Sequence, residues 1–197
     1  QAVERIILAN AFRVKIIAEA QIKTDKIDAR KLAWLLRAGL IPAIHIPDAF
    51  TRSRREVIRQ RMFWVKTRTR IRNRIHRIIE RQHDLNMPEV TDVFGRKGKA
   101  ALNSAVLEEP DAALLRQNLE ALNELDRFVR ENEAHMKKIS KEDSDTQILT
   151  SIPGVGLTIG SVLASEIDGI ERFKTPEKLC AYAGLVPSTY SSGGKTR

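Results

Sequence analysis

Residues 48–83 read DAFTRSRREVIRQRMFWVKTRTRIRNRIHRIIERQH, and this stretch decides the fold of the chain. It contains neither glycine nor proline, the two residues that most readily end a helix. Apolar residues recur three or four positions apart, as in Ile58, Met62 and Val65, which is the spacing of one helix face. The sequence therefore predicts one long helix from about Asp48 to His83.

The same stretch is strongly basic. Between Thr51 and His83 it carries 12 Arg or Lys residues against Glu56 and Glu80, a net charge of +10. The twelve, called the arginine ridge below, are Arg52, Arg54, Arg55, Arg59, Arg61, Lys66, Arg68, Arg70, Arg72, Arg74, Arg77 and Arg81. Two interpretations stay open: the charges pair with an acidic partner helix, or they bind phosphate, which arginine grips with parallel hydrogen bonds.

A second uninterrupted stretch, from about Pro110 to Ser140, predicts the partner helix. Its apolar positions are spaced three or four apart, at Leu115, Leu119, Leu122, Leu125 and Val129. Two long helices with a short connection indicate an antiparallel helical hairpin or coiled coil. The expected contacts join two sets of residues, within or between chains: Leu115, Leu119 and Leu122 with Ile58, Met62 and Val65. Residues 108–145 carry 11 acidic against 6 basic residues, a net charge of −5, which offsets only half of the ridge and favours phosphate binding.

Composition bounds the class of protein. Of the 197 residues 42% are hydrophobic but only 5% are aromatic, so aliphatic side chains must fill the core, which favours helix-on-helix packing. The 34 basic and 25 acidic residues give a net charge of +9, which points to DNA, RNA or another phosphate-rich partner. No apolar run approaches the ~18 residues of a membrane span. The single cysteine, Cys180, excludes an intrachain disulfide and indicates a cytoplasmic protein with Cys180 in its core.

The remaining segments are shorter. Residues 3–8 are apolar and β-branched and predict a buried strand, and Ala11–Ala20 and Thr24–Gly39 predict helices. Residues 41–47 predict a short strand or an extended linker, and residues 84–100 a loop-rich region. Two short helices and then one over 175–184 are expected in the last part. The predicted organisation is a partial α/β start over 1–47, a helical region over 48–142 and a last domain over 143–197.

Asp25 and Asp28 lie on the predicted helix over 24–39. On a helical wheel they extend the apolar stripe of Leu32, Leu35 and Leu36. One interpretation is capping, with Asp25 as the N-cap and Asp28 in the first turn, where the helix dipole favours negative charge. The other is binding of a divalent cation, because Mg²⁺ prefers oxygen ligands. The two interpretations are compatible.

Residues 149–160, LTSIPGVGLTIG, fit a helix-hairpin-helix pattern. Gly154 and Gly156 would let the backbone approach a phosphate, which the free N–H groups of the following helix would bind. Such a site holds the backbone of a nucleic acid without reading its bases. The alternative is an ordinary tight turn between two helices.

The last residues are polar. Hydroxyl groups cluster at Ser188, Thr189, Tyr190, Ser191 and Ser192, ahead of Gly193, Gly194 and the cationic Lys195. One interpretation is a flexible polar loop at the end of the chain. A hydroxyl nucleophile needs a base, a metal ion or a lowered pKa to be active, and no histidine is near in sequence. Ser192 and Tyr190 are rival candidates for that role.

Several of these motifs resemble one known family. KTDKIDA at 23–29, LLRAGL at 35–40, SIPGVG at 151–156, AYAGLVP at 181–187 and YSSG at 190–193 are similar to the DEDD insertion-sequence transposases of the IS110 family, which are related to the Piv DNA invertases. The resemblance runs through nearly the whole chain in the right order.

The resemblance implies a Mg²⁺-dependent DNA transposase or site-specific recombinase that cuts and exchanges strands. It implies an opening segment from a resolvase-like, RNase H-type domain, with Asp25 and Asp28 as the last two of four metal-binding carboxylates. It also implies Ser192 as the nucleophile, dimerisation through the coiled coil and direction by a structured guide RNA. The expected nucleic-acid contacts are Arg59, Arg68, Arg70, Arg72, Arg74, Arg77, Gly154, Gly156 and Lys195.

The other two carboxylates of the set should precede residue 1, and helices should follow Arg197. We therefore expect a fragment of a bacterial or archaeal protein that alone is inactive. A different class stays open as the alternative, a non-catalytic DNA- or RNA-binding coiled-coil protein with a helix-hairpin-helix module.

Overall fold

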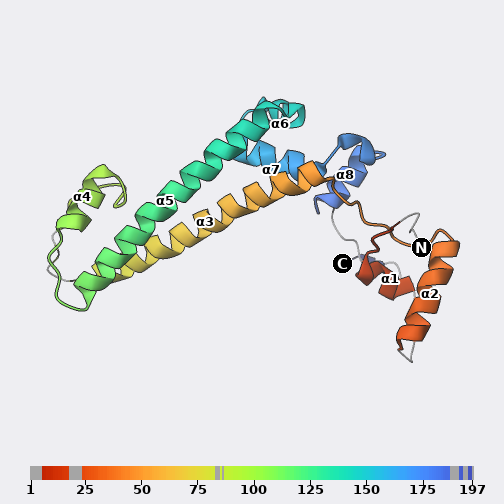
Figure 1. Ribbon diagram of the computed structural model, residues 1–197, viewed down its shortest axis with the longest axis horizontal. Coiled ribbons are helices and arrows are strands. Elements are labelled where there is room, and N and C mark those ends of the chain that lie inside the picture. Colours follow the sequence, from red (N-terminus) through yellow and green to blue (C-terminus); the bar gives the residue numbers. More distant parts are fainter. Residues whose placement is uncertain are drawn as a thin grey trace. The chain divides into compact units, whose positions relative to one another are not determined.

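The computed structural model describes residues 6–17, 24–82, 85, 87–186, 191–192 and 195–196, with side chains up to residue 186 other than those of residues 16 and 17. The chain divides into two compact units, Gln1–Ala49 and Phe50–Arg197. The elements of the first are α1 (Ala11–Ile17) and α2 (Asp25–Arg37). Figure 1 labels these and the elements of the second: α3 (Ala49–Glu80), α4 (Arg96–Ser104), α5 (Asp111–Lys141), α6 (Ser144–Thr150), α7 (Leu157–Ile167), η1 (Ile170–Arg172), α8 (Pro176–Tyr182), β1 (Ser191–Ser192) and β2 (Lys195–Thr196).

Helix α2 has defined signals at both ends. Thr24 is the N-cap, because its hydroxyl oxygen accepts a hydrogen bond from the backbone N–H of Ile27 at 3.4 Å. The predicted N-cap, Asp25, is therefore wrong by one residue: Asp25 begins the helix, and Asp28 lies with it in the first turn, as predicted. Past the C-terminal end Gly39 has φ +68°, the left-handed conformation that glycine adopts without strain. This confirms Gly39 as the stop signal.

The predicted buried strand over 3–8 does not form in residues 6–8, where Ile6 and Leu8 are exposed; residues 3–5 lie outside the described residues. A single antiparallel bridge joins Ala9 to Ala43, supported by the hydrogen bond from Ile44 N to Leu8 O at 2.7 Å. A strand becomes buried only when sheet neighbours and a packed layer cover it, and the described residues of this unit supply one extended segment. Residues 41–47 lie in no helix and no named strand, and Ala43 takes part in the bridge to Ala9, which agrees with the predicted linker.

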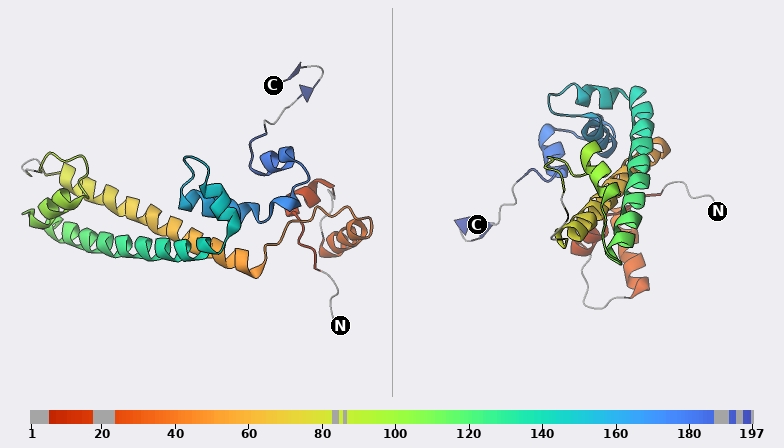
Figure 2. Two further views of the ribbon diagram at one scale, coloured as in Figure 1. Left: turned by 90° about the horizontal axis from the view of Figure 1, so that it is seen from above. Right: turned by 90° about the vertical axis from the view of Figure 1, so that its left-hand side faces the viewer.

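Helices α3 and α5 lie side by side and run in opposite directions (Figures 1 and 2). Ion pairs Arg61–Glu133 at 2.5 Å and Arg68–Asp126 at 3.4 Å join the two helices directly. Two more lie at the ends: Arg54 of α3 pairs at 2.5 Å with Asp143, just past α5, and Arg81, just past α3, pairs at 2.8 Å with Asp111 of α5. The start of α3 is therefore next to the end of α5, and the predicted antiparallel helical hairpin is present.

The core confirms the predicted apolar face of α5 and corrects its register. Its predicted positions Leu115, Leu119, Leu122, Leu125 and Val129 are all buried. The first three cluster with Ile75 and Ile78, near the end of α3. Within the chain the predicted partners Ile58, Met62 and Val65 are wrong, because they lie nearer the start of α3 and an antiparallel pair places that start beside the end of α5. Ile58 instead lies beside Met136 and Ile139.

Helix α4 covers the far end of the hairpin, so the predicted loop-rich region over 84–100 is wrong over residues 96–100; the described residues ahead of Arg96 in that region lie in no helix. Its Leu102, together with Phe94, joins the core cluster. Gly98 is buried inside this helix, and a Cβ added there would overlap the backbone carbonyl of Val93. Glycine at position 98 is therefore required for close approach of the chain, not for a turn.

The other end of the hairpin is joined to the C-terminal helices by side chains of α3, and we call these contacts the joint. Thr51 donates a hydrogen bond to Asp168 at 2.7 Å, and Arg55 donates one to the carbonyl oxygen of Ser165 at 2.8 Å. The Arg54–Asp143 pair is almost fully buried, and Asp143 also accepts a hydrogen bond from Thr146. A buried ion pair needs hydrogen bonds to its remaining polar atoms; Thr146 supplies one to Asp143, whereas the Nε of Arg54 is buried without a hydrogen-bond partner among the described residues.

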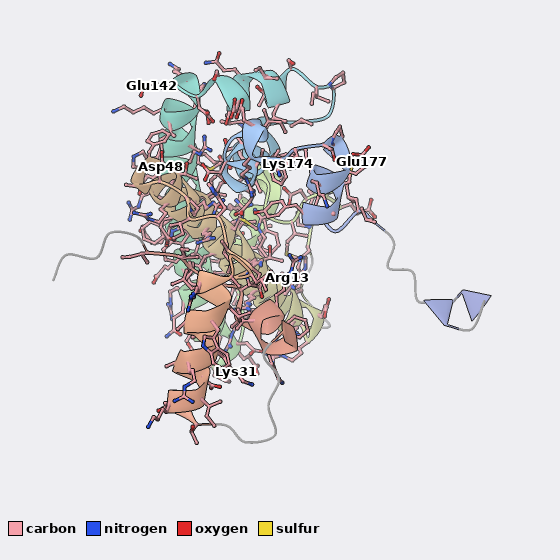
Figure 3. The ribbon with its side chains drawn as sticks, turned by 90° about the vertical axis from the view of Figure 1, so that its right-hand side faces the viewer. Arg13, Lys31, Asp48, Glu142, Lys174 and Glu177 are labelled. Carbon is pink, nitrogen blue, oxygen red and sulfur yellow. The ribbon has the colours of Figure 1, made fainter. Side chains whose placement is uncertain are left out.

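The C-terminal helices follow as predicted, with α6 and α7 on either side of the glycine-rich turn and α8 over 176–182. Figure 3 labels Glu142 at the end of α5, Lys174 ahead of α8 and Glu177 in its first turn; it also labels Arg13 on α1, Lys31 on α2 and Asp48 ahead of α3. Cys180 is exposed, so its prediction as a core residue is wrong. Within the described part of the chain, no helix combines the length and apolar character that crossing a membrane requires.

Replacing Leu122 by alanine should lower the free energy of unfolding by about 2–5 kcal/mol, because its side chain has 0% exposure and the cavity cannot close fully. Urea unfolding followed by circular dichroism measures the loss. The control is Gln117→Ala on an exposed position of the same helix, which should change it by less than about 0.5 kcal/mol. Equal effects of the two substitutions would contradict the described core.

Candidate nucleic-acid interface and carboxylate pair

The arginine ridge separates into two faces. Its inward members are Arg54, Arg55, Arg61, Arg68 and Arg72. The first four contact the acidic groups or carbonyl oxygens of the neighbouring helices. Arg72 lies over the ring of Phe94 at 5.0 Å, and the Nε atoms of Arg68 and Arg72 are buried. The paired-charge interpretation of the sequence therefore holds for this face.

The outward members are Arg52, Arg59, Lys66, Arg70, Arg74, Arg77 and Arg81, which we call the cationic stripe. All seven are exposed. At 100° per residue they fall within an arc of about 80° and extend over about 44 Å of the helix. Arg59 pairs with Glu56, and Arg81 with Asp111. Among the described residues, Lys66, Arg70, Arg74 and Arg77 have no ion-pair partner, and no acidic residue occurs on α3 between Glu56 and Glu80.

The charged residues on the outer surface of α5 do not neutralise the positive charge of the cationic stripe. Its acidic residues Asp111, Asp126 and Glu133 face α3 and pair with it. Of the charged residues exposed on its outer surface, the acidic ones are Glu120, Glu124 and Glu131, and the basic ones are Arg116, Arg127, Arg130, Lys137, Lys138 and Lys141. The outer surfaces of both long helices are therefore positively charged, which suits a polyanion.

Asp126 is the acidic group that faces the middle of the ridge. Burial by itself raises the pKa of its carboxyl, but the hydrogen bond from Lys99 and the charges of Lys99, Arg68 and Arg72 lower it by more. The pKa of Asp126 therefore lies below its ordinary value. The ammonium of Lys99 is 2.8 Å from the carboxylate, which ties α4 to the hairpin.

The nucleic-acid contacts predicted on α3 lie partly on its outward face and partly on its inward face. Arg59, Arg70, Arg74 and Arg77 lie on the cationic stripe and are accessible to a ligand. Arg68 and Arg72 lie in the hairpin interface, where their long apolar stems are packed. Substituting Arg68 or Arg72 would therefore disturb the fold as well as any ligand contact.

Asp25 and Asp28 lie in the first turn of α2, on the same side of the helix because three residues separate them. Asp25 is exposed and Asp28 is half-buried. The apolar stripe that they extend is not buried: Leu32 and Leu36 are exposed, and α2 has no buried residue.

This pair offers carboxylate oxygens, which suit a divalent cation. No group of three or more acidic, histidine or cysteine side chains suited to a metal gathers within the described residues. The donor chemistry of Asp25 and Asp28 fits half of a metal site.

The glycine-rich turn joins α6 to α7. Gly154 has φ +87°, which favours glycine, and Gly156 is the N-cap of α7 with open space around it. A groove of about 450 Å³ lies beside this N-terminus, with Lys137 and Thr158 among its lining residues.

Gly160 has a structural role that the sequence analysis missed. It is buried, and a Cβ there would lie 2.8 Å from the Thr150 side chain, so it permits close packing of α6 on α7. The four-residue spacing of Gly156 and Gly160, which places both on one helix face, is the signal that could have identified it.

In the polar tail, Ser191–Ser192 forms β1, which pairs antiparallel with β2, and Ser192 lies opposite Lys195. The tail therefore contains a short hairpin where a flexible loop was one expectation. Tyr190 lies outside the described residues. Ser192 and the Asp25–Asp28 pair belong to different units.

Two family models match this chain. A DEDD transposase model of the IS110 type matches residues 6–83, and the model described as "Transposase IS116/IS110/IS902 family" matches residues 146–197. The first range contains Asp25, Asp28 and all of α3, and the second contains the glycine-rich turn and Ser192. Together the two ranges cover more than half of the chain, in the order that the sequence motifs predict.

Curated relatives agree with these matches. The chain is 24% identical over 189 residues to a "Probable family 20 transposase" of Pseudomonas aeruginosa. This match covers 89% of this chain and 54% of that protein. It is 42% identical over 71 residues to the "Transposase for insertion sequence element IS1111A" of Coxiella burnetii, covering 36% and 19%. It is 34% identical over 68 residues to the "Transposase for insertion sequence element IS1328" of Yersinia enterocolitica, covering 34% and 20%. The chain spans about half, or less, of the length of these relatives.

Asp126→Asn should destabilise the chain by about 1 kcal/mol at pH 7, because the carboxylate bonds Lys99 and faces two arginines. A carboxyl with a lowered pKa stabilises the fold above about pH 4, and this contribution is lost as the pH falls through that pKa. Denaturant unfolding from pH 7 to pH 3 should therefore show the wild-type advantage disappearing in acid. Glu120→Gln, on the exposed side of α5, is the control and should leave the profile unchanged. A constant difference at every pH would contradict the ionic role of Asp126.

Proposed function

Because this chain belongs to the IS110 family of insertion-sequence transposases, we propose that it acts in DNA transposition, as part of a recombinase that cuts and exchanges DNA strands. The observation that carries the proposal is the presence of both family domains in order on one chain. A purely binding protein, the alternative that the sequence left open, is disfavoured by the DEDD match around Asp25 and Asp28.

In this proposal the cationic stripe binds the phosphate backbone of DNA or of a structured guide RNA. The support is its seven exposed cations on one line, which outer charges of α5 do not neutralise. Gly154 and Gly156, with Lys195 in the tail, would add contacts to the phosphate backbone, as in a helix-hairpin-helix module. A dimer formed through the hairpin would use surfaces other than the stripe, because two copies of the stripe repel each other.

Asp25 and Asp28 would hold Mg²⁺ together with the two other carboxylates that the DEDD resemblance implies. The bound ion would stabilise negative charge on a phosphate. Ser192 would supply the nucleophile: its Oγ bonds to phosphorus as one P–O bond of the strand breaks. The serine proton leaves, and the departing sugar oxygen gains a proton. The phosphoserine link keeps the strand activated for the second transfer.

Replacing Arg70, Arg74 and Arg77 together by glutamine should weaken nucleic-acid binding and its dependence on salt. With about five phosphates neutralised, log K should fall with log salt at a slope of about −4 to −5, and the triple variant should lose about 3 from that slope. Fluorescence anisotropy of a labelled duplex at several salt concentrations measures both quantities.

The matched control removes the same charge elsewhere, by Arg116→Gln, Arg130→Gln and Lys138→Gln on the outer surface of α5. It should change the slope much less. If both triple variants lose the same affinity, only net charge matters and the stripe is not the binding surface. A slope near zero for the unaltered chain would refute phosphate binding itself.

Ser192→Ala should abolish the covalent protein–DNA adduct in a transposase of full family length that carries this chain, whereas Ser191→Ala and Tyr190→Phe should retain it. Asp25→Asn should also abolish the adduct while DNA affinity changes less than about twofold. Adducts are trapped by denaturation and seen as slow bands on gels with labelled DNA. An adduct that survives Ser192→Ala and disappears in either neighbouring variant would move the nucleophile to that neighbour.

A further inference from the structure

Phe63 interrupts the cationic stripe with an exposed aromatic ring. Its side chain is 53% exposed, although phenylalanine is ordinarily a core residue. On the helical wheel it lies within about 60° of Arg59, Lys66 and Arg70, one turn before and one and two turns after it. The large apolar residues that contribute to the core from this helix, such as Ile58 and Ile75, point to the opposite side and are buried.

Other aromatic rings pack against the Phe63 ring on the side of the hairpin interface. Its centroid is 4.8 Å from that of Trp64, and the Trp64 ring lies 5.0 Å from that of Phe128 on α5. These tilted ring contacts, at interplanar angles of 60° and 31°, connect the stripe to the hairpin interface and restrict how the Phe63 side chain can turn. The exposed part of the ring is therefore held in place on the helix surface.

The surroundings determine which ligand fits this ring. A second copy of this surface would bring Arg59, Lys66 and Arg70 against their own copies, which charge repulsion opposes. The outer surface of α5 has no acidic excess to attract it. A ligand that presents both negative charges and flat apolar faces is a nucleic acid with unpaired bases, since a duplex stacks its bases inside.

We propose that Phe63 is a stacking platform for an unpaired base of a bound DNA or RNA strand, whose phosphates follow Lys66, Arg70, Arg74 and Arg77 along α3. The platform and the last of these cations are about 21 Å apart along the helix. This inference rests on the proposed function of the stripe and adds to it: the ligand includes a single-stranded or looped segment.

The test uses the full 197-residue chain with Trp34→Phe, which leaves Trp64 as its single tryptophan. Labelled oligonucleotides of one sequence serve as probes, as single-stranded DNA, single-stranded RNA and a blunt DNA duplex. Phe63→Leu keeps an apolar side chain but removes the ring. It should raise the Kd for single strands by about 5- to 150-fold, the value of one stacked base, and leave duplex binding unchanged.

Two further variants separate stacking from loss of apolar contact. Phe63→Tyr keeps the ring and should restore single-strand binding. Met62→Ala shortens the exposed neighbour, which lies about 100° away on the wheel, and should have no effect. Single strands should alter the fluorescence of Trp64 in the protein that retains Phe63 and in the Phe63→Tyr variant but not in the Phe63→Leu variant.

Each other outcome overturns a different statement. Equal single-strand affinity with and without the Phe63→Leu substitution, together with weakened binding by the Arg70, Arg74 and Arg77 variant, would refute the platform and leave the stripe intact. If neither Phe63→Leu nor the triple arginine variant changes the affinity for single strands, the stripe is refuted as the binding surface as well. A shift from dimer to monomer in Phe63→Leu, seen by sedimentation, would assign the ring to contact with a second copy. The ratio of effects on the DNA and RNA strands identifies which of them is the ligand.

Discussion

The antiparallel pairing of basic α3 with the acidic inner face of α5 is the interaction on which the described fold of Phe50–Arg197 depends. Ion pairs from Arg54–Asp143 to Arg81–Asp111 set the direction and register of the two helices, and buried leucines fill the space between them. A helix with the charge of α3 repels itself along its length. Neutralising one face of α3 leaves exposed cations along the other face, so stability of the hairpin and affinity for a polyanion come from opposite sides of one helix.

Much of this fold follows from the sequence because long helices give a strong signal. The bounds of α3 and α5 and the burial of Leu115, Leu119 and Leu122 come from spacing alone. The register does not, because a repeat every three or four residues fits several alignments equally well. Charge pairing would have fixed it: Arg68 with Asp126 and Arg61 with Glu133 fit a single antiparallel alignment.

Other features depend on contacts that a local pattern does not contain. The local sequence at Gly98 suggests a loop residue, but the close backbone of Val93 is what requires a glycine there. The local sequence at Arg72 suggests a surface cation, but its guanidinium lies over the ring of Phe94. The strand expected near residue 6 lacks the sheet neighbours that would bury it among the described residues. For the candidate site, Asp25 and Asp28 could be placed on one helix side by spacing, and the role of Ser192 comes from resemblance. Their relation in space lies beyond what either kind of reasoning provides.

The joint gives the hairpin the properties of a lever. Thr51, Arg54 and Arg55 hold one end of α3 against Asp168, Asp143 and Ser165, while the other end projects away from the joint with α4 packed on it. An arm of 32 residues is about 48 Å long, so a rotation of about 10° at its base moves its tip by about 8 Å. A small change at a few hydrogen bonds is thereby amplified into a displacement as large as the separation of neighbouring helices. Force applied along the stripe by a bound strand would likewise be concentrated as torque on the buried pair of Arg54 and Asp143.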